Sequence, residues 1–438
     1  MPGAAGAAGA DAALPPARLA WLTLAALFAA YILSFVDRMI IGLLVDGIKR
    51  DLNITDTQVS LLQGLAFALF FTVAAIPIGR LVDRVHRARA VAGGIALWSV
   101  MTMACGWAAS FPALFAARMG VGVGEAVLSP AAYSVINDSF PRRRLGLAMG
   151  IFGLGSAVGA GLAFMIGGAV VALVANADTL SLPLVGALRP WQFAFVVAGL
   201  PGLAIALLFL VIPDPRHRAG AVPGAVPLRT VARHLRVNAR FFVAIFGAVA
   251  AVNVAVLGSV SWLPALLIRG FALPVDRAGY LSGGLLIVGG LIGMVGGGIA
   301  MDRIGGGSPS ARLRFAGTAT ALATVAAVAF PLVGSLWVLG FAFVAFFAAA
   351  ASVVGAAPAV LQMLAPDGMR ATIAAVYVFV INGIGIGFGP SVTAVLGDRL
   401  FPGGDGIRYA MAIVAPTGYA IGAILFFIAA RRASSPSR

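Results

Sequence analysis

Long apolar segments recur through the whole 438-residue chain, and they limit it to one class of fold. A helix needs about 20 consecutive apolar residues to cross the hydrocarbon core of a bilayer. Hydrophobic residues make up 61% of the chain and charged residues 10%, against about 45–50% and about 25% in soluble proteins. We therefore predict an all-α polytopic membrane protein with twelve transmembrane helices, at residues 20–45, 57–80, 89–110, 112–138, 146–174, 191–212, 240–268, 279–300, 312–333, 336–364, 371–397 and 408–430.

The basic residues are distributed unevenly around these segments and predict the orientation in the membrane. Twenty-one of the 30 lysine and arginine residues fall on the side that holds the N-terminus, and seven fall on the opposite side. Because loops rich in these residues stay in the cytoplasm, we expect both termini to be cytoplasmic, in a bacterial inner (plasma) membrane. The net charge of +15 does not indicate nucleic-acid binding, since the arginines occupy short gaps between apolar segments.

The twelve segments divide into two sets of six around a longer polar stretch. A repeat supports this division, because the run from Gly79 to Arg84 after the second segment recurs as Gly298 to Arg303 after the eighth. Transporters are often built from such repeats, with the substrate site between them. We expect a disordered tail over 1–19, an N-terminal six-helix bundle over 20–212, a cytoplasmic linker over 213–239, a C-terminal six-helix bundle over 240–430 and a cytoplasmic tail over 431–438.

Both copies of the repeat place a glycine four residues before an Asp-Arg pair at the cytoplasmic end of a span. The glycine permits close helix packing, and the aspartate can accept hydrogen bonds from a helix N-terminus or from an arginine across an interface. Breaking and remaking such a contact would bias which side of the protein is open. The predicted gating residues are Gly79, Asp83, Arg84, Arg87, Asp302 and Arg303.

Four charged residues lie well inside the predicted spans: Asp37, Arg38, Arg118 and Glu125. A charge at the centre of a span costs about 2.5–3.5 kcal/mol on insertion and indicates a functional site by default. Because arginine does not deprotonate, Arg38 and Arg118 suit an anionic head group such as a phosphate or a carboxylate. Glu125, the only glutamate of the chain, and Asp37 are the candidates for exchanging a proton. The alternative is that these charges only tie the first and fourth spans together as ion pairs.

The two halves differ in polarity. Away from their ends, spans seven to twelve contain no ionisable side chain other than tyrosine, and only scattered polar groups. A ligand between the halves would therefore meet charge on one side and apolar surface on the other, which suits an amphipathic molecule with an anionic or zwitterionic head. The alternative is that the C-terminal half merely packs tightly through its glycines. The candidate cavity-lining residues are Tyr31, Ser129, Tyr133, Asn253, Tyr377 and Asn382.

Two sets of residues carry a resemblance to a known family. The run from Gly79 to Arg87 resembles the loop signature of the major facilitator superfamily, although His86 stands where that signature usually has glycine. The run from Arg118 to Pro141, with Asp37-Arg38, resembles the Spinster branch of that superfamily. This resemblance implies export of lysophospholipids or sphingosine-1-phosphate-like lipids, often linked to protons. It also implies that Arg38 holds the head group and that Glu125 and Asp37 handle the proton.

The sequence thus favours a secondary active transporter that works by alternating access and exports an amphipathic lipid with proton coupling. The alternatives are a proton-driven drug or organic-anion transporter, and a passive lipid scramblase or channel. An enzyme is not expected, because no nucleophile–base or metal-ligand motif appears in the sequence. We expect no cofactor besides the proton gradient and no metal. The expected partners are the lipid substrate, protons and the bilayer, with no nucleic acid, and the protein is expected to function as a monomer.

Overall fold

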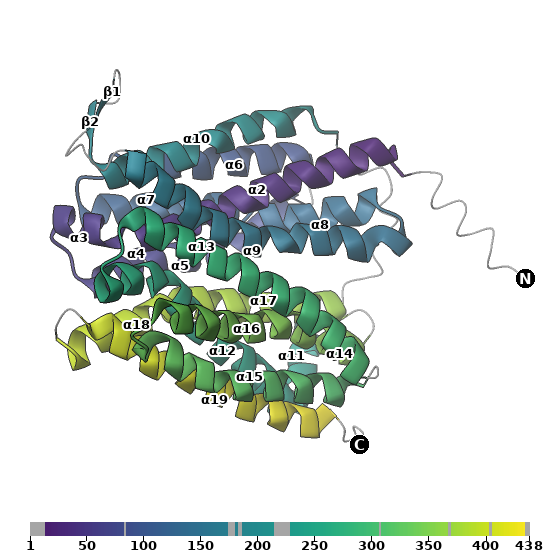
Figure 1. Ribbon diagram of the computed structural model, residues 1–438. Helices are drawn as coiled ribbons and strands as arrows, with labels where there is room; N and C mark the ends of the chain where they lie inside the picture. Colours follow the sequence, from purple (N-terminus) through teal and green to yellow (C-terminus); the bar gives the residue numbers. More distant parts are fainter. Residues whose placement is uncertain are drawn as a thin grey trace, which may run out of the picture. The chain divides into compact units, whose positions relative to one another are not determined.

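The computed structural model describes residues 14–82, 85–173, 180–182, 186–213, 228–305, 308–366, 369–402 and 405–433 (Figure 1). Within these residues, twelve helices are long and apolar enough to cross a membrane. The prediction of an all-α protein with twelve transmembrane helices is therefore confirmed. A short antiparallel hairpin between the fifth and sixth spans was not predicted, and it pairs β1 (Leu180–Leu182) with β2 (Gly186–Leu188).

The residues of the chain group into two compact units. The first unit comprises residues 1–41 and 69–221, and the second comprises residues 42–68 and 222–438. The division expected from chain position placed 42–68 in the N-terminal bundle, whereas the structure groups this segment with the second unit. The physical reason is close packing: a Cβ atom added at Gly64 would lie only 2.5 Å from the carbonyl oxygen of Ile386.

Helices in the first part of the chain carry the buried charges. Their bounds are α2 (Ala17–Leu43), α3 (Val45–Leu52), α4 (Asp56–Gln63), α5 (Leu65–Val82), α6 (Arg87–Cys105), α7 (Phe111–Glu125), α8 (Leu128–Ser139), α9 (Arg142–Leu173) and α10 (Pro190–Val211). The first span therefore begins at Ala17, inside the tail that was expected to end at residue 19.

The predicted fourth span is interrupted between α7 and α8, directly after Glu125. Pro130 lacks the backbone N–H that a continuous helix would donate to the carbonyl of Ala126. The interruption therefore follows from a residue visible in the sequence, and it places Glu125 at the end of a helix.

Helices in the rest of the chain include two π-helical segments. Their bounds are α11 (Leu228–Val237), α12 (Ala239–Phe271), α13 (Val275–Leu291), η1 (Ile292–Gly296), α14 (Gly297–Gly305), α15 (Pro309–Leu332), α16 (Leu336–Leu364), α17 (Arg370–Val380), η2 (Ile381–Ile386), α18 (Gly387–Leu400) and α19 (Gly406–Ala433). The π-helices η1 and η2 interrupt the eighth and eleventh spans, a type of irregularity that is frequent at functional sites. Helix α11 lies inside the stretch expected to be a linker.

Glycines allow neighbouring helices of the first unit to pack closely. A Cβ atom added at Gly94 of α6 would lie 2.8 Å from the carbonyl oxygen of Gly124 on α7, whereas one added at the adjacent Gly93 would meet nothing within 4 Å. Small residues allow this close approach between membrane helices. The contact fixes α7 against α6, and Glu125 follows Gly124 directly.

Candidate functional site

An ion pair between α2 and α7 forms the centre of the candidate site. The Nε atom of Arg38 donates to Oε2 of Glu125 at 2.6 Å, and Nη2 of Arg38 lies 2.5 Å from the same oxygen. The Ser34 hydroxyl, one turn before Arg38 on α2, also donates to Oε2 at 2.6 Å. The Glu125 side chain is fully buried, and the Arg38 side chain is 10% exposed. Two residues that the sequence marked as functional are therefore in direct contact.

The second pair of predicted residues lies on the same two helices. Nη1 of Arg118 donates to the backbone carbonyl of Asp37 at 2.8 Å, and both side chains are buried. Among the described residues, no hydrogen-bond donor reaches Oδ1 of Asp37 or Oε1 of Glu125. Each carboxylate thus keeps a buried oxygen that could take up a proton without breaking an existing hydrogen bond.

Aromatic rings surround the Arg38 end of the ion pair. The Arg38 guanidinium lies 5.0 Å from the ring centroids of Phe35 and Phe71, within the range of a cation–π interaction. Tyr31 stacks on Phe152 at 4.5 Å between ring centroids. These rings give the charged pair an apolar rim.

The remaining lining candidates of the first unit lie on α8. Tyr133 packs edge-on against Phe152 at 5.6 Å between centroids and is exposed. Ser129, one turn earlier on the same helix, is partly exposed. Because Tyr31 also contacts Phe152, the structure brings Tyr31 and Tyr133 to one aromatic cluster.

The lining candidates of the second unit lie beside the π-helix η2. The Nδ2 atom of Asn253 on α12 lies 3.5 Å from the carbonyl oxygen of Ile381 and can donate to it. Asn382, the next residue of η2, is partly exposed, whereas Tyr377 is buried. The structure therefore places Asn253 and Asn382 close to one irregular helical segment.

Of the predicted gating residues, Arg87 has the best-defined contacts. Its Nη1 atom donates to Oδ2 of Asp138 and to the hydroxyl of Ser134, both at 2.6 Å. The Arg87 side chain is 3% exposed, so the pair ties the start of α6 to the end of α8. Asp138 was left out of the site prediction because it lies near the end of its span.

The other gating candidates are less well defined. Asp83 and Arg84 lie outside the described residues, and Arg303 is exposed at the end of α14. Gly79 and Asp302 lie in α5 and α14. The gating role of these residues stays a prediction.

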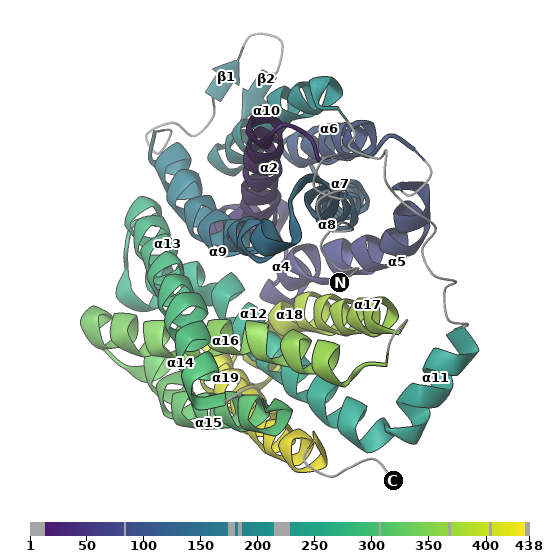
Figure 2. The same cartoon turned by 90° about the vertical axis from the view of Figure 1, so that its right-hand side faces the viewer.

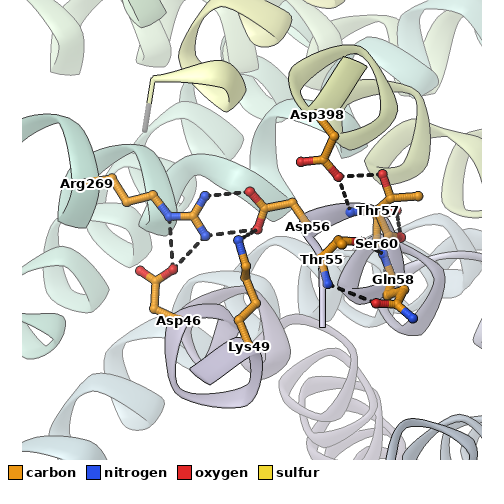
Figure 3. A network of polar contacts seen from close by, with 9 residues as sticks. All are labelled: Asp46, Lys49, Thr55, Asp56, Thr57, Gln58, Ser60, Arg269 and Asp398. Carbon is orange, nitrogen blue, oxygen red and sulfur yellow. Dashed lines mark hydrogen bonds and ion pairs between the residues drawn. The ribbon is translucent and has the colours of Figure 1, made fainter. Parts of the chain in front are cut away.

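A network of charged residues in the second unit was not predicted (Figure 3). Arg269, at the end of α12, lies between two aspartates: its Nη2 atom is 2.6 Å from Oδ1 of Asp46 on α3, and its Nη1 atom is 2.8 Å from Oδ2 of Asp56 on α4. Lys49 adds a third contact, with Nζ 2.7 Å from Oδ1 of Asp56. By the expected orientation, all of these residues lie at the non-cytoplasmic ends of their helices.

The start of α4 also contacts the carboxylate of Asp398 (Figure 3). The backbone N–H and the hydroxyl of Thr57 donate to Oδ2 of Asp398, on α18, at 2.9 and 2.6 Å. A carboxylate at the first turn of a helix is stabilised by the free N–H groups and the helix dipole. The dense run of charges from Asp46 to Asp56 is the sequence feature that could have indicated this network. Only its basic residues were used, to predict the orientation in the membrane.

Comparisons with known proteins agree with the sequence-based resemblance. A sequence model described as the Major Facilitator Superfamily matches residues 27–390. The chain is 25% identical over 417 residues to an MFS-type efflux pump of Mycolicibacterium smegmatis, a match that covers 95% of this chain and 94% of that protein. It is 31% identical over 250 residues to Protein spinster homolog 1 of Rattus norvegicus, covering 54% of this chain and 44% of the rat protein. The chain thus spans less than half the length of that relative.

A solved structure resembles the whole chain. It is the crystal structure of a bacterial homolog to the human lysosomal transporter Spinster, in an inward-facing and unoccupied conformation. It matches with a TM-score of 0.81 and 26% sequence identity, over 97% of this chain and 100% of that one. The similarity therefore extends over all twelve spans.

Proposed function

Because the chain belongs to the major facilitator superfamily, we propose that it is a proton-coupled secondary active transporter that exports a lysophospholipid or a sphingosine-1-phosphate-like lipid by alternating access. That it is a multi-pass membrane transporter of the Spinster type follows from the family match and the similar structure. The mycobacterial relative's description as an efflux pump supports the direction of export. The proposal further places the protein in a bacterial inner membrane with both termini in the cytoplasm.

One observation supports both the lipid and the proton assignments. The buried Glu125 carboxylate forms an ion pair with Arg38, and aromatic rings surround the Arg38 guanidinium. Arg38 donates to Oε2 of Glu125 and lies 5.0 Å from the Phe35 and Phe71 ring centroids. An anionic head group would need the same guanidinium N–H groups, while the rings suit the hydrocarbon that follows the head group. Glu125 and the lipid therefore compete for Arg38.

Protonation changes this competition. A protonated Glu125 carries no charge, so its attraction for Arg38 falls and the guanidinium becomes available to an anion. The occupancy of the lipid site thereby depends on the protonation of Glu125, and Asp37, next to Arg38 in α2, is a second group that can take up a proton. The network around Arg269 belongs to the same cycle, because opening the non-cytoplasmic side requires α3 and α4 to separate from α12 and α18.

Transport by the reconstituted protein tests this proposal. Fluorescently labelled lysophospholipid is followed in liposomes with and without an imposed pH gradient, for the wild type and for Glu125→Gln. We expect the gradient to accelerate wild-type transport and to have no effect on Glu125→Gln. Asp405→Asn is the matched control, because Asp405 is an exposed carboxylate, and it should keep the response. Wild-type transport that ignores the gradient would instead support a passive scramblase or channel.

A binding titration tests the role of Arg38. Arg38→Ala should weaken lysophospholipid binding roughly tenfold or more, because a hydrogen bond to a charged group contributes about 1.5–3 kcal/mol. Arg277→Gln removes the same charge from an exposed position and should leave the affinity unchanged. Equal affinities for wild type and Arg38→Ala would refute this role, and preferential binding of a tail-free organic anion would refute the lipid assignment.

A further inference from the structure

Helix α11 carries a row of arginines along one face. Arg229, Arg233 and Arg236 follow each other at spacings of four and three residues, which places them on one side of an α-helix. Arg240 lies four residues further on, in the first turn of α12 and beyond the turn at Asn238. All four side chains are exposed. We call these four residues the α11 basic face.

Among the residues that the structure describes, no acidic side chain pairs with the α11 basic face. The sequence holds no aspartate or glutamate between Asp214 and Asp276. An uncompensated cluster of this kind attracts an anionic partner.

The opposite side of α11 is fixed to the protein. Val231 is 2% exposed, and the His234 ring packs edge-on against Phe242 of α12 at 5.7 Å between centroids. The Nδ2 atom of Asn238 donates to the carbonyl oxygen of His234 at 3.1 Å across the turn between the two helices. Helix α11 lies at the periphery of the second unit (Figure 2). The basic face is therefore held in place and remains accessible.

The end of the basic face coincides with the start of the apolar surface of α12. Val243 follows Arg240 by three residues, on the same face of the helix, and is 68% exposed. Arg240 stands in the first turn of this membrane-spanning helix, so it lies at an end of the span, where head groups are expected. Clusters of basic residues directly next to a spanning helix bind anionic lipid head groups.

We propose that the α11 basic face binds the phosphate groups of anionic phospholipids in the adjoining leaflet, with an acyl chain of the bound lipid against Val243. This lipid is a component of the membrane and not the transported substrate. The inference does not depend on the proposed transport activity, because it uses none of the residues assigned to the transport site.

Thermal unfolding of the full chain in mixed micelles tests the proposal. Phosphatidylglycerol, added as the anionic probe, should raise the unfolding temperature of the wild type more than an equal amount of phosphatidylcholine does. The triple variant Arg229→Gln/Arg233→Gln/Arg236→Gln should lose most of this difference. Each arginine near an anionic surface contributes roughly fivefold in affinity, so phosphatidylglycerol binding should weaken at least tenfold. High salt should likewise weaken phosphatidylglycerol binding to the wild type, because it screens exposed charges.

Three controls make the result specific. Arg277→Gln/Arg399→Gln removes exposed arginines elsewhere and should keep the response, as should Arg38→Gln, which alters the transport site. Replacing the three α11 arginines by lysine retains their charge, so this variant should keep most of the phosphatidylglycerol-dependent rise in unfolding temperature. It provides a test even if the glutamine variant does not fold. An unchanged phosphatidylglycerol response in the folded glutamine variant, or its loss in the Arg38→Gln variant, would overturn the proposal.

Discussion

Arg38 and Arg118 look equivalent in the sequence, as two arginines inside membrane spans, but they make different contacts. Arg38 reaches a carboxylate with its side chain and keeps 10% of its side-chain surface exposed. Arg118 is fully buried and donates to the backbone carbonyl of Asp37. The contact of Arg118 ties α7 to the backbone of α2, whereas that of Arg38 joins two side chains. A head-group role for Arg118 stays a prediction.

At the residue scale, the Arg87–Asp138 pair allows a stability prediction. Asp138→Asn removes the charged acceptor of a guanidinium that is only 3% exposed. We expect the free energy of unfolding to fall by about 1.5–3 kcal/mol, the range for hydrogen bonds to charged groups. The measurement is reversible denaturation in micelles. Asp405→Asn, at an exposed position, is the control, and an equal effect of both substitutions would contradict the prediction.

Sequence reasoning identified the four intramembrane charges but could not assign their partners. Asp37, Arg38, Arg118 and Glu125 stand out because charge is rare in apolar spans. Pairing depends on helix rotation and depth, which hydropathy does not determine. The sequence therefore predicted Arg38 and Glu125 as residues of one site, but only the structure shows that the two side chains are in direct contact.

At the scale of the helices, their existence was predictable and their interruptions were not. Hydropathy averages over about 19 residues, so it is insensitive to a single missing N–H such as that of Pro130. It also gives no sign of the π-helices η1 and η2 in the eighth and eleventh spans. Helix α11 was missed for the opposite reason, since a short amphipathic helix with many arginines has low hydropathy.

Two adjacent glycines of α6 provide a test of helix packing. Gly94→Ala would place a Cβ atom 2.8 Å from the backbone oxygen of Gly124, whereas Gly93→Ala would meet nothing within 4 Å. We expect Gly94→Ala to destabilise the protein by about 1–3 kcal/mol through overpacking. Gly93→Ala should instead stabilise it by roughly 0.4–1 kcal/mol, because alanine has less backbone freedom to lose on folding. Thermal unfolding of the two variants should therefore shift in opposite directions, and a shared direction would argue against close packing of α6 on α7.

At the scale of the whole molecule, contacts between residues far apart in the sequence hold the predicted non-cytoplasmic ends of several helices together. Arg269 binds Asp46 and Asp56, which are more than 200 positions earlier in the sequence. In the sequence, Arg269 is one of the seven basic residues on the side opposite the N-terminus, and its partners could not be predicted because pairing over such separations is set by the tertiary fold. This network is the part of the structure that sequence reasoning missed most completely.

Removing Arg269 should favour the state that is open on the non-cytoplasmic side. Ser60 is fully buried one turn after Asp56 on α4, so a Ser60→Cys thiol reports on opening. In a Cys105→Ala background, which removes the only native cysteine, Arg269→Gln should accelerate its labelling by an impermeant maleimide at least tenfold. The substitution removes the charged donor of two part-buried ion pairs, and a hydrogen bond to a charged group contributes about 1.5–3 kcal/mol. Arg277→Gln, with an exposed arginine, is the control. Equal labelling rates in the two variants would contradict a gating role for the network.

The grouping of residues 42–68 with the second unit has a consequence for fragment complementation. A cut between Ala221 and Val222 separates the chain at one unit boundary, but leaves α3 and α4 on the first fragment. The second fragment then lacks the acids that contact Arg269 and the Gly64 segment that packs against Ile386, so the second unit is incomplete, whereas the first fragment holds the whole first unit. Co-expressed fragments should consequently recover a folded protein, because the first fragment supplies the segment that the second unit lacks, whereas the second fragment produced alone should be degraded.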